Sequence, residues 1–274
     1  MLSLTVEKFS LEHSLESGQC FYWKKEGTTY TIITQGEHIQ LQQENNKLNF
    51  TFLNSKKSNQ HQKEFVQHFF GLNQDFNTIL KEITKDPIVK EAVNQYPGLR
   101  ILQQDPWECT IGFICSSAAN IPKIQRNIHL LAQTFGKKEN NIYHFPKPGS
   151  LNNLKKIQQC GVGFRSKYLL AANKLLTKEK IQEIKMLPYE KAKEELMKIQ
   201  GIGPKIADCI LLFSFQRFEA FPVDVWIKRA MEELYLKKET KEEEIREYAQ
   251  KTFGKYAGYA QQYLFQKQRL LKRS

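Results

Sequence analysis

Residues 199–205 read Ile-Gln-Gly-Ile-Gly-Pro-Lys, and Asp224 follows the lysine by nineteen residues. The glycines Gly201 and Gly203 let the backbone turn sharply and come close to a partner. Pro204 suits the first turn of a helix, whose leading amides have no partner inside the helix and can bind an anion such as a DNA phosphate. The segment therefore predicts a hairpin between two helices, with an anion-binding start to the second.

Lys205 and Asp224 form a candidate catalytic pair. The positive end of the helix dipole disfavours a charged ammonium at Lys205, which favours a neutral, nucleophilic amine. Asp224 precedes the run 225–234, which predicts another helix. Each residue alone has an ordinary interpretation, as a solvated first-turn lysine and an N-cap aspartate. The combination of hairpin, lysine, apolar helix, Pro-Val-Asp and second helix is far more specific than its parts.

The net charge of +12 is unevenly distributed. Residues 1–100 carry 11 basic and 11 acidic side chains, whereas residues 101–274 carry 30 basic and 18 acidic ones. The last 24 residues hold six basic and no acidic side chains. A basic excess confined to one part of a chain favours a polyanion-binding surface there, although lysine-rich solubility is the simpler alternative.

The five cysteines are single and odd in number, which favours reduced thiols in an intracellular protein. We expect no metal site and no cofactor, because no Cys-x-x-Cys pair occurs. No run is long enough to span a membrane, and no signal peptide is expected at the N-terminus. We therefore expect an intracellular monomer, in the cytoplasm or nucleoid of a prokaryote or the nucleus of a eukaryote.

The chain changes from strand-like to helical patterning. Alternating segments predict strands at Leu2–Val6, Cys20–Trp23, Thr29–Ile33, His38–Gln42 and Leu48–Phe52. Charged or polar segments such as 24–27 are expected to be turns. From about residue 63 the spacing becomes helical, with breaks at 145–149, 187–188 and 221–222. We expect an α+β protein, with an N-terminal antiparallel β-sheet domain and linking helices over residues 1–100 and a larger all-α body over residues 101–274.

Several blocks of this sequence resemble the 8-oxoguanine DNA glycosylases, members of the helix-hairpin-helix DNA glycosylases. They occur in family order between residues 17 and 265, at 17–23, 104–108, 113–117, 161–165, 205–209 and 256–265. The resemblance covers nearly the whole chain and identifies residues 101–274 as a helix-hairpin-helix glycosylase domain. A second branch of these enzymes carries a four-cysteine iron–sulfur cluster near its C-terminus, and this chain has no cysteine beyond Cys209.

The resemblance implies a bifunctional enzyme, a DNA glycosylase with abasic-site lyase activity, that removes 8-oxoguanine from double-stranded DNA in base excision repair. Lys205 would be the nucleophile that forms an imine, and Asp224 would stabilise the positive charge that develops on the sugar. Gly18 would accept the N7 hydrogen of the oxidised base through its backbone carbonyl. The flipped base would also contact three side chains: Gln261 on its Watson–Crick edge, and Cys209 and Phe265 on its faces.

The same resemblance implies a set of DNA contacts. The hairpin glycines Gly201 and Gly203 would bind phosphate through backbone amides. Phe164 would fill the gap that the flipped base leaves, and Arg165 would contact the orphaned partner base. Two alternatives remain: an alkylpurine DNA glycosylase of the same fold, which would lack the lysine, and a non-catalytic helix-hairpin-helix DNA-binding protein, which would have no use for Asp224.

The sequence departs from the family pattern where the partner base is expected. The pattern places asparagine after the two serines and arginine five residues later, and both reach the cytosine opposite the lesion. This chain has Ala118 and Lys123 at those positions. Trp226 also replaces a histidine that follows the aspartate in the family pattern. The departures weaken the expected recognition of the opposite base but leave Lys205 and Asp224 intact.

Ala118 has no polar side-chain atom, and Lys123 is a flexible point charge where a planar donor is expected. We therefore expect excision of 8-oxoguanine opposite several bases, with discrimination below roughly a hundredfold. The measurement is single-turnover excision with C, A, G or T opposite the lesion, for the wild type and for Ala118→Asn/Lys123→Arg. A strong wild-type requirement for cytosine would show that another group, such as Arg165 or Asn120, recognises the partner.

Overall fold

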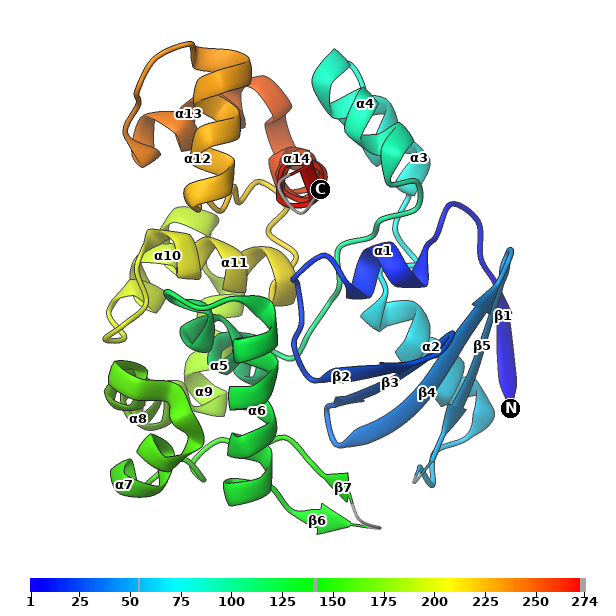
Figure 1. Ribbon diagram of the computed structural model, residues 1–274, viewed down its shortest axis with the longest axis vertical. Helices are drawn as coiled ribbons and strands as arrows, with labels where there is room; N and C mark the ends of the chain where they lie inside the picture. Colours follow the sequence, from blue (N-terminus) through cyan, green and yellow to red (C-terminus); the bar gives the residue numbers. More distant parts are fainter. Residues whose placement is uncertain (54, 140–141, 272–274) are drawn as a thin grey trace.

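A β-sheet unit lies beside a larger helical body (Figure 1). The computed structural model describes residues 1–53, 55–139 and 142–271. The sheet contains β1 (Leu2–Thr5), β2 (Trp23–Glu26), β3 (Thr29–Thr34), β4 (Glu37–Glu44) and β5 (Lys47–Phe52). All neighbouring strands are antiparallel, in the order β1-β5-β4-β3-β2. The antiparallel sheet expected from sequence alternation is thereby confirmed.

Strand β2 corrects one expectation. Residues 20–22 lie outside any strand, whereas Lys24, Lys25 and Glu26, which were expected to form a turn, pair with β3. Among the described residues β2 is an edge strand that pairs only with β3, so charged side chains can project from it into solvent. Hydrophobic alternation therefore gives a weak signal at such a strand.

The helices begin and end largely where capping residues and breaks indicate. Asp75, Asp86, Asp105 and Asn120 each cap a helix by accepting a backbone N–H bond. The predicted breaks at 145–149, 187–188 and 221–222 all lie between helices. The helices are α1 (Leu11–Leu15), α2 (Asn59–Phe69), α3 (Phe76–Ile83), α4 (Pro87–Gln95), α5 (Pro106–Ser116), α6 (Ile121–Phe135), α7 (Leu154–Ile157), α8 (Ser166–Leu175), α9 (Lys178–Met186), α10 (Tyr189–Met197), α11 (Pro204–Ser214), α12 (Val225–Met231), α13 (Glu242–Phe253) and α14 (Ala257–Leu271). A small hairpin, β6 (Lys138–Glu139) and β7 (Ile142–Tyr143), interrupts the helical part.

The buried apolar residues of the described chain form two hydrophobic cores. One lies between the sheet and helices α1 and α2, and includes Leu15, Ile39 and Phe50. The other fills the helical body and also takes in α3 and α4, which pack against α14. Residues 76–95 thus pack with the helical body although they precede residue 100. The domain boundary at residue 100 stays a prediction.

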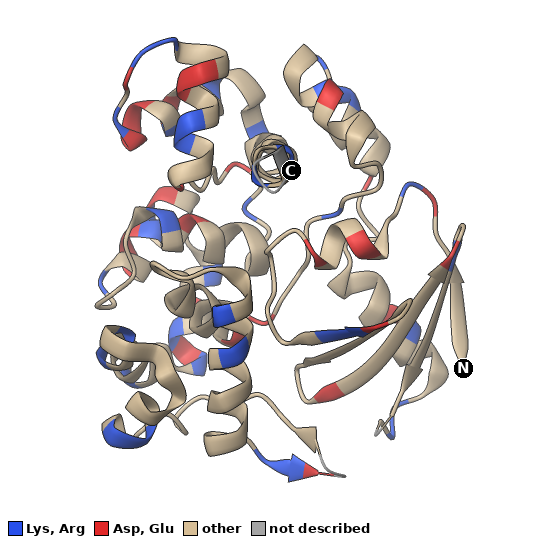
Figure 2. Ribbon diagram, viewed as in Figure 1, with Lys and Arg blue, Asp and Glu red and all other residues tan. Residues whose placement is uncertain are grey.

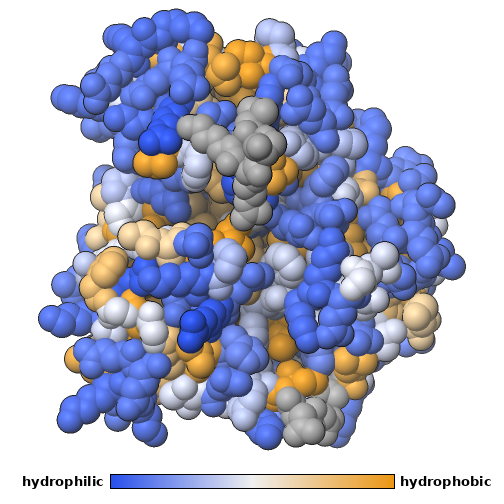
Figure 3. All heavy atoms as spheres, in the orientation of Figure 1, coloured by the Kyte–Doolittle hydropathy of each residue, from blue (hydrophilic) through white to orange (hydrophobic). Residues whose placement is uncertain are grey.

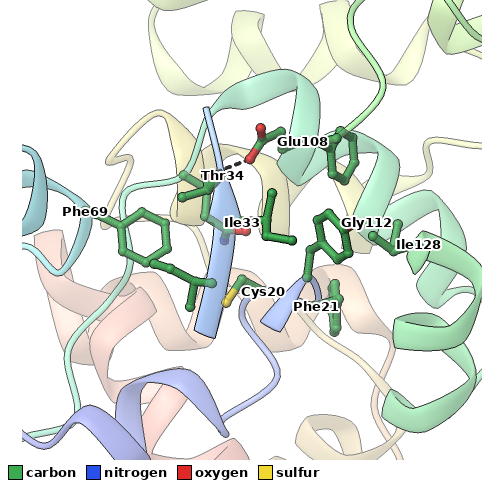
Figure 4. A pocket seen from close by; sticks show the side chains of 12 residues that line it. Cys20, Phe21, Ile33, Thr34, Phe69, Glu108, Gly112 and Ile128 are labelled. Atoms are coloured by element: carbon green, nitrogen blue, oxygen red, sulfur yellow. Dashed lines mark hydrogen bonds between the residues drawn. The ribbon is translucent and has the colours of Figure 1, made fainter. Parts of the chain in front are cut away.

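Glu108 of α5 connects the helical body to the sheet. Its carboxyl group accepts hydrogen bonds from Thr34 Oγ1 (2.6 Å) and the Gln35 N–H (2.7 Å). The Thr34 bond borders a cavity of about 30 Å³, which Cys20, Phe21 and Phe69 help to line (Figure 4). Burial, together with the nearby charge of Asp105, raises the pKa of Glu108 to about 8.

We expect the fold to lose stability as the Glu108 carboxyl loses its proton, because burial penalises the charged form more than its two hydrogen bonds favour it. The folded state raises its pKa from 4.5 to about 8, so the folded chain holds the proton more tightly than the unfolded chain. Raising the pH across that interval therefore favours unfolding. The wild-type Tm should fall more between about pH 5 and pH 8 than the Tm of Glu108→Gln, which cannot ionise. Parallel profiles of Tm against pH would contradict this assignment.

Candidate active site

The hairpin at residues 199–203 has the predicted geometry. The Ile202 N–H donates to the Ile199 carbonyl over 3.0 Å, and α11 begins at Pro204 as expected. Gly201 has a φ of +92°, and a Cβ there would lie 2.2 Å from Tyr168 Cγ. A Cβ on Gly203 would meet nothing within 4 Å. Gly201 is thus required by packing and conformation, whereas Gly203 leaves its backbone open to an outside partner.

Six sequence-predicted residues line one cavity of about 770 Å³, a size usual for ligand sites. Lys205 and Cys209 come from α11, one helical turn apart on the same face. Asp224 stands at the start of α12, and the other three are Gly18, Gln261 and Phe265. Elements far apart in sequence therefore converge on one hollow.

The Lys205 amine points toward the end of α5. Its Nζ lies 3.5 Å from Ser116 Oγ and 5.5 Å from the centroid of the Phe113 ring. Ser116 Oγ donates its proton to the Phe113 carbonyl over 2.7 Å, so its lone pairs can face the amine. Within the described ranges, Lys205 makes no salt bridge. Asp224 therefore acts on Lys205 through space and does not hold it in a direct ion pair.

Asp224 caps α12 and faces the cavity as well. Its Oδ1 accepts from the backbone N–H groups of Trp226 (3.0 Å) and Ile227 (2.8 Å). Burial raises the pKa of Asp224, while the Ile227 N–H bond and the Lys205 charge act in the opposite direction. Asp224 thus caps α12 and lines the cavity at the same time.

The base-binding candidates surround the inner cavity. Gln261 Nε2 donates to the Pro222 carbonyl over 3.0 Å, whereas its buried Oε1 has no hydrogen-bond partner in the described residues. Cys209 is buried, and burial raises the pKa of its thiol to about 12, so it stays a neutral thiol. Gly18 has a φ of +76°, and a Cβ there would lie 3.5 Å from Phe265 Cε1. The cavity thus combines apolar walls with one unused acceptor.

The predicted DNA-contacting residues lie outside this lining. Phe164 is 58% exposed, as an inserting side chain requires, whereas the neighbouring Arg165 is only 2% exposed. Lys123 is exposed in the first turn of α6. Residues 121–175 carry ten Lys or Arg side chains and a single acidic one, Glu139.

This charge distribution is visible on the helical body. Lys and Arg predominate over α6–α8, whereas both signs occur around the sheet (Figure 2). In the same orientation the surface is mostly hydrophilic, with apolar side chains in scattered patches (Figure 3). A polar, basic surface around Phe164 suits a phosphate backbone.

Two departures from the family pattern lie at the cavity. Ala118 and Trp226 both line it. Ala118 has a φ of +47°, in the left-handed region that asparagine tolerates better than alanine. Ala118→Asn should therefore be accommodated by the backbone, so that the opposite-base variant tests recognition and leaves folding intact.

Sequence reasoning missed the contacts that orient the site. Ser116 belongs to a quoted block, but its position beside Lys205 depends on the packing of α5 against α11. The Pro222 carbonyl that fixes Gln261 is 39 residues away in sequence. No local pattern records either contact, because both arise from the tertiary arrangement of helices.

The described residues contain no group of three or more His, Cys, Asp or Glu side chains placed to hold a metal ion. Across the same residues, no helix is both long and apolar enough to cross a membrane.

Comparison with known proteins gives consistent matches. Residues 1–110 match the family model described as 8-oxoguanine DNA glycosylase, N-terminal domain. A Methanothermobacter thermautotrophicus protein named "Probable N-glycosylase/DNA lyase" is 32% identical over 233 residues, covering 74% of this chain and 73% of the relative. The Saccharomyces cerevisiae N-glycosylase/DNA lyase is 28% identical, covering 97% of this chain and 85% of the relative.

Solved structures extend the comparison. The 8-oxoguanine glycosylase/lyase of Clostridium acetobutylicum, solved with double-stranded DNA containing cytosine opposite 8-oxoguanine, has a TM-score of 0.91 and 34% identity, covering 97% of this chain and 94% of that one. The 3-methyladenine DNA glycosylase of Archaeoglobus fulgidus has a TM-score of 0.80 at 18% identity, covering 99% of each chain. The second likeness concerns the fold alone.

Asp224→Asn tests the charge at this site, because asparagine caps a helix as well as aspartate does. We expect single-turnover excision to fall by roughly 10²-fold or more, with little change in affinity for damaged duplex. The ratio of wild-type to variant excision rates should also shrink as the pH falls through the Asp224 pKa, which burial raises above 3.8. Wild-type rates in a folded Asp224→Asn would overturn the assignment.

Proposed function

Because the chain belongs to the 8-oxoguanine DNA glycosylase/lyase family, we propose that it excises 8-oxoguanine from duplex DNA and then cleaves the abasic strand. The observation that carries this proposal is the meeting of Lys205 and Asp224 in the same cavity as the base-binding candidates. Such an enzyme would act in base excision repair, in the nucleoid of a prokaryote or the nucleus of a eukaryote.

DNA capture would use the hairpin and the basic surface of α6–α8. The open backbone at Gly203 and the first-turn amides of α11 suit a phosphate oxygen. The target base must be unstacked and rotated out of the duplex, which costs a few kcal/mol. Phe164 is exposed and aromatic, so it can occupy the vacated position and stabilise kinked DNA.

The inner cavity would recognise the flipped base. The Pro222 carbonyl accepts one N–H of the Gln261 amide and so fixes its orientation, and the free Oε1 can accept from the N–H donors on the Watson–Crick edge of a guanine-type base. The Gly18 carbonyl would accept the N7 hydrogen that distinguishes 8-oxoguanine from guanine. The neutral Cys209 thiol and the Phe265 ring offer apolar contacts to the base faces.

The chemistry follows from the two catalytic candidates, Asp224 and Lys205. An ionised Asp224 would stabilise the oxocarbenium-like sugar as the bond from C1′ to the base breaks and the base leaves with the electron pair. A neutral Lys205 amine would attack C1′ and, after proton loss and ring opening, form an imine. The imine acidifies the hydrogen on C2′, and its removal expels the 3′ phosphate. Base excision and strand cleavage would then share one covalent intermediate.

Two other functions fit the features less well. The likeness to a 3-methyladenine glycosylase concerns the fold, and Lys205 has no role in an enzyme that works without a lysine nucleophile. A purely DNA-binding hairpin module has no use for a cavity of about 770 Å³ beside Asp224. Excision from a panel of alkylated and oxidised duplexes distinguishes an 8-oxoguanine glycosylase from an alkylpurine glycosylase. Covalent trapping distinguishes an enzyme from a module that only binds DNA.

Borohydride trapping on 8-oxoguanine duplex tests the proposal. The reagent should reduce the imine to a stable covalent protein–DNA adduct, and Lys205→Gln should abolish that adduct. DNA binding should persist in the variant, because the hairpin holds phosphate through backbone amides. Lys178→Gln, which changes an exposed lysine outside the cavity, is the matched control and should trap normally. Undiminished trapping in Lys205→Gln would place the nucleophile elsewhere.

A further inference from the structure

Arg165 lies beneath the exposed ring of Phe164, the side chain that would insert into DNA under the proposed function. Its guanidinium carbon is 4.8 Å from the Phe164 ring centroid, and the side chain is 2% exposed. Residues 161–165, termed the wedge loop, span the end of a π-helical turn (Gln158–Val162) and a 3-10 turn (Gly163–Arg165) between α7 and α8, with Gly161 and Gly163 at positive φ. The guanidinium of Arg165 therefore lies buried against the chain and not in solvent.

Three donor nitrogens of Arg165 are bound to backbone carbonyls. Nε donates to Ser117 over 2.7 Å, one terminal nitrogen donates to Ala118 over 3.2 Å, and the other donates to Val162 over 2.8 Å. Two of these acceptors belong to residues 116–120, termed the serine loop, and the third belongs to the wedge loop. The planar guanidinium presents its donors in a fixed fork, so it holds the two loops in one geometry.

The serine loop begins at the residue that contacts the nucleophile. Ser116 is the last residue of α5, directly before the clamped Ser117 and Ala118. Its hydroxyl proton is engaged by the Phe113 carbonyl, and its oxygen lies 3.5 Å from Lys205 Nζ. A continuous path of covalent and hydrogen bonds thus runs from the wedge loop through Arg165 and Ser116 to Lys205.

Given the function proposed above, we infer that Arg165 is a positioning residue for Lys205, acting from the wedge loop through the serine loop and the Ser116 hydroxyl. The wedge loop, which carries Phe164, and the serine loop, which places the Lys205 amine, are thereby joined into one rigid unit. A guanidinium that moved out of this clamp would have to release three charge-assisted hydrogen bonds.

The test compares Arg165→Lys with the wild type on two duplexes, one with 8-oxoguanine opposite cytosine and one with it opposite a tetrahydrofuran abasic analogue. Lysine keeps the charge but lacks the fork. We expect single-turnover excision at saturating enzyme to fall by roughly tenfold or more on both duplexes, with little change in half-saturation, because a misplaced nucleophile slows the chemical step. A defect that disappears on the abasic-opposed duplex would overturn the inference and assign Arg165 to the partner base.

Arg217→Lys is the matched control. Arg217 also donates to two backbone carbonyls, those of Lys185 and Leu187, but lies outside the cavity lining. We expect it to retain wild-type excision, and a thermal melt of each variant separates loss of folding from loss of positioning. An equal fall in Arg217→Lys would show that the Arg165 effect is general destabilisation.

A double-mutant cycle tests the path itself. Ser116→Ala should slow excision on both duplexes, and Arg165→Lys/Ser116→Ala should be about as slow as the slower single variant, because both changes act on the same contact. Effects that multiply would show that the two residues act independently and would overturn the inference. Wild-type trapping in the same experiment tests the proposed function separately, so the two failures are distinguishable.

Discussion

The buried carboxylate of Asp208 fixes the helix on which the active site depends. Asp208 is fully buried in α11 and accepts from Tyr189 Oη (2.6 Å) while pairing with Lys193 (2.9 Å) and Arg246 (2.9 Å). Burial raises its pKa, and these three partners oppose that rise. A buried charge must meet its partners or incur a large desolvation cost, so the cluster holds α11 in one position against α10 and α13.

This cluster matters because hydrophobic burial alone does not determine how α11 is rotated about its axis. Residues 206–213 are all buried, so hydrophobic periodicity gives no preferred face. Once Asp208 is fixed, Lys205 and Cys209 turn together toward the cavity, and Phe213 stacks on Phe113 of α5 with ring centroids 5.4 Å apart. That contact brings α5, and with it the hydroxyl of Ser116, up to the lysine.

The sequence predicted the parts of this arrangement that local physics determines. Alternation predicted the antiparallel sheet, and proline and capping residues predicted helix ends such as Pro204. The β2 strand was not predicted over its observed residues, because an edge strand can carry charged side chains that face solvent. The two catalytic candidates form a local motif, whereas the Ser116 contact and the buried position of Arg165 depend on helices packed together from distant parts of the chain. Such contacts leave no spacing that a reader of the sequence could recognise.

The serine loop shows how positioning and recognition can be separated in one structure. Ala118 holds a left-handed conformation that costs roughly 1–2 kcal/mol for an alanine, and its short side chain makes no compensating polar contact. Arg165 bonds the Ala118 carbonyl and the preceding one, so the loop keeps its shape through its backbone and not through the side chain at position 118. A side chain that reads the partner base can therefore be absent without displacing Ser116 from Lys205. Under the inference above, base excision would depend on the clamped backbone, whereas discrimination of the opposite base would depend on side chains that the clamp leaves free to vary.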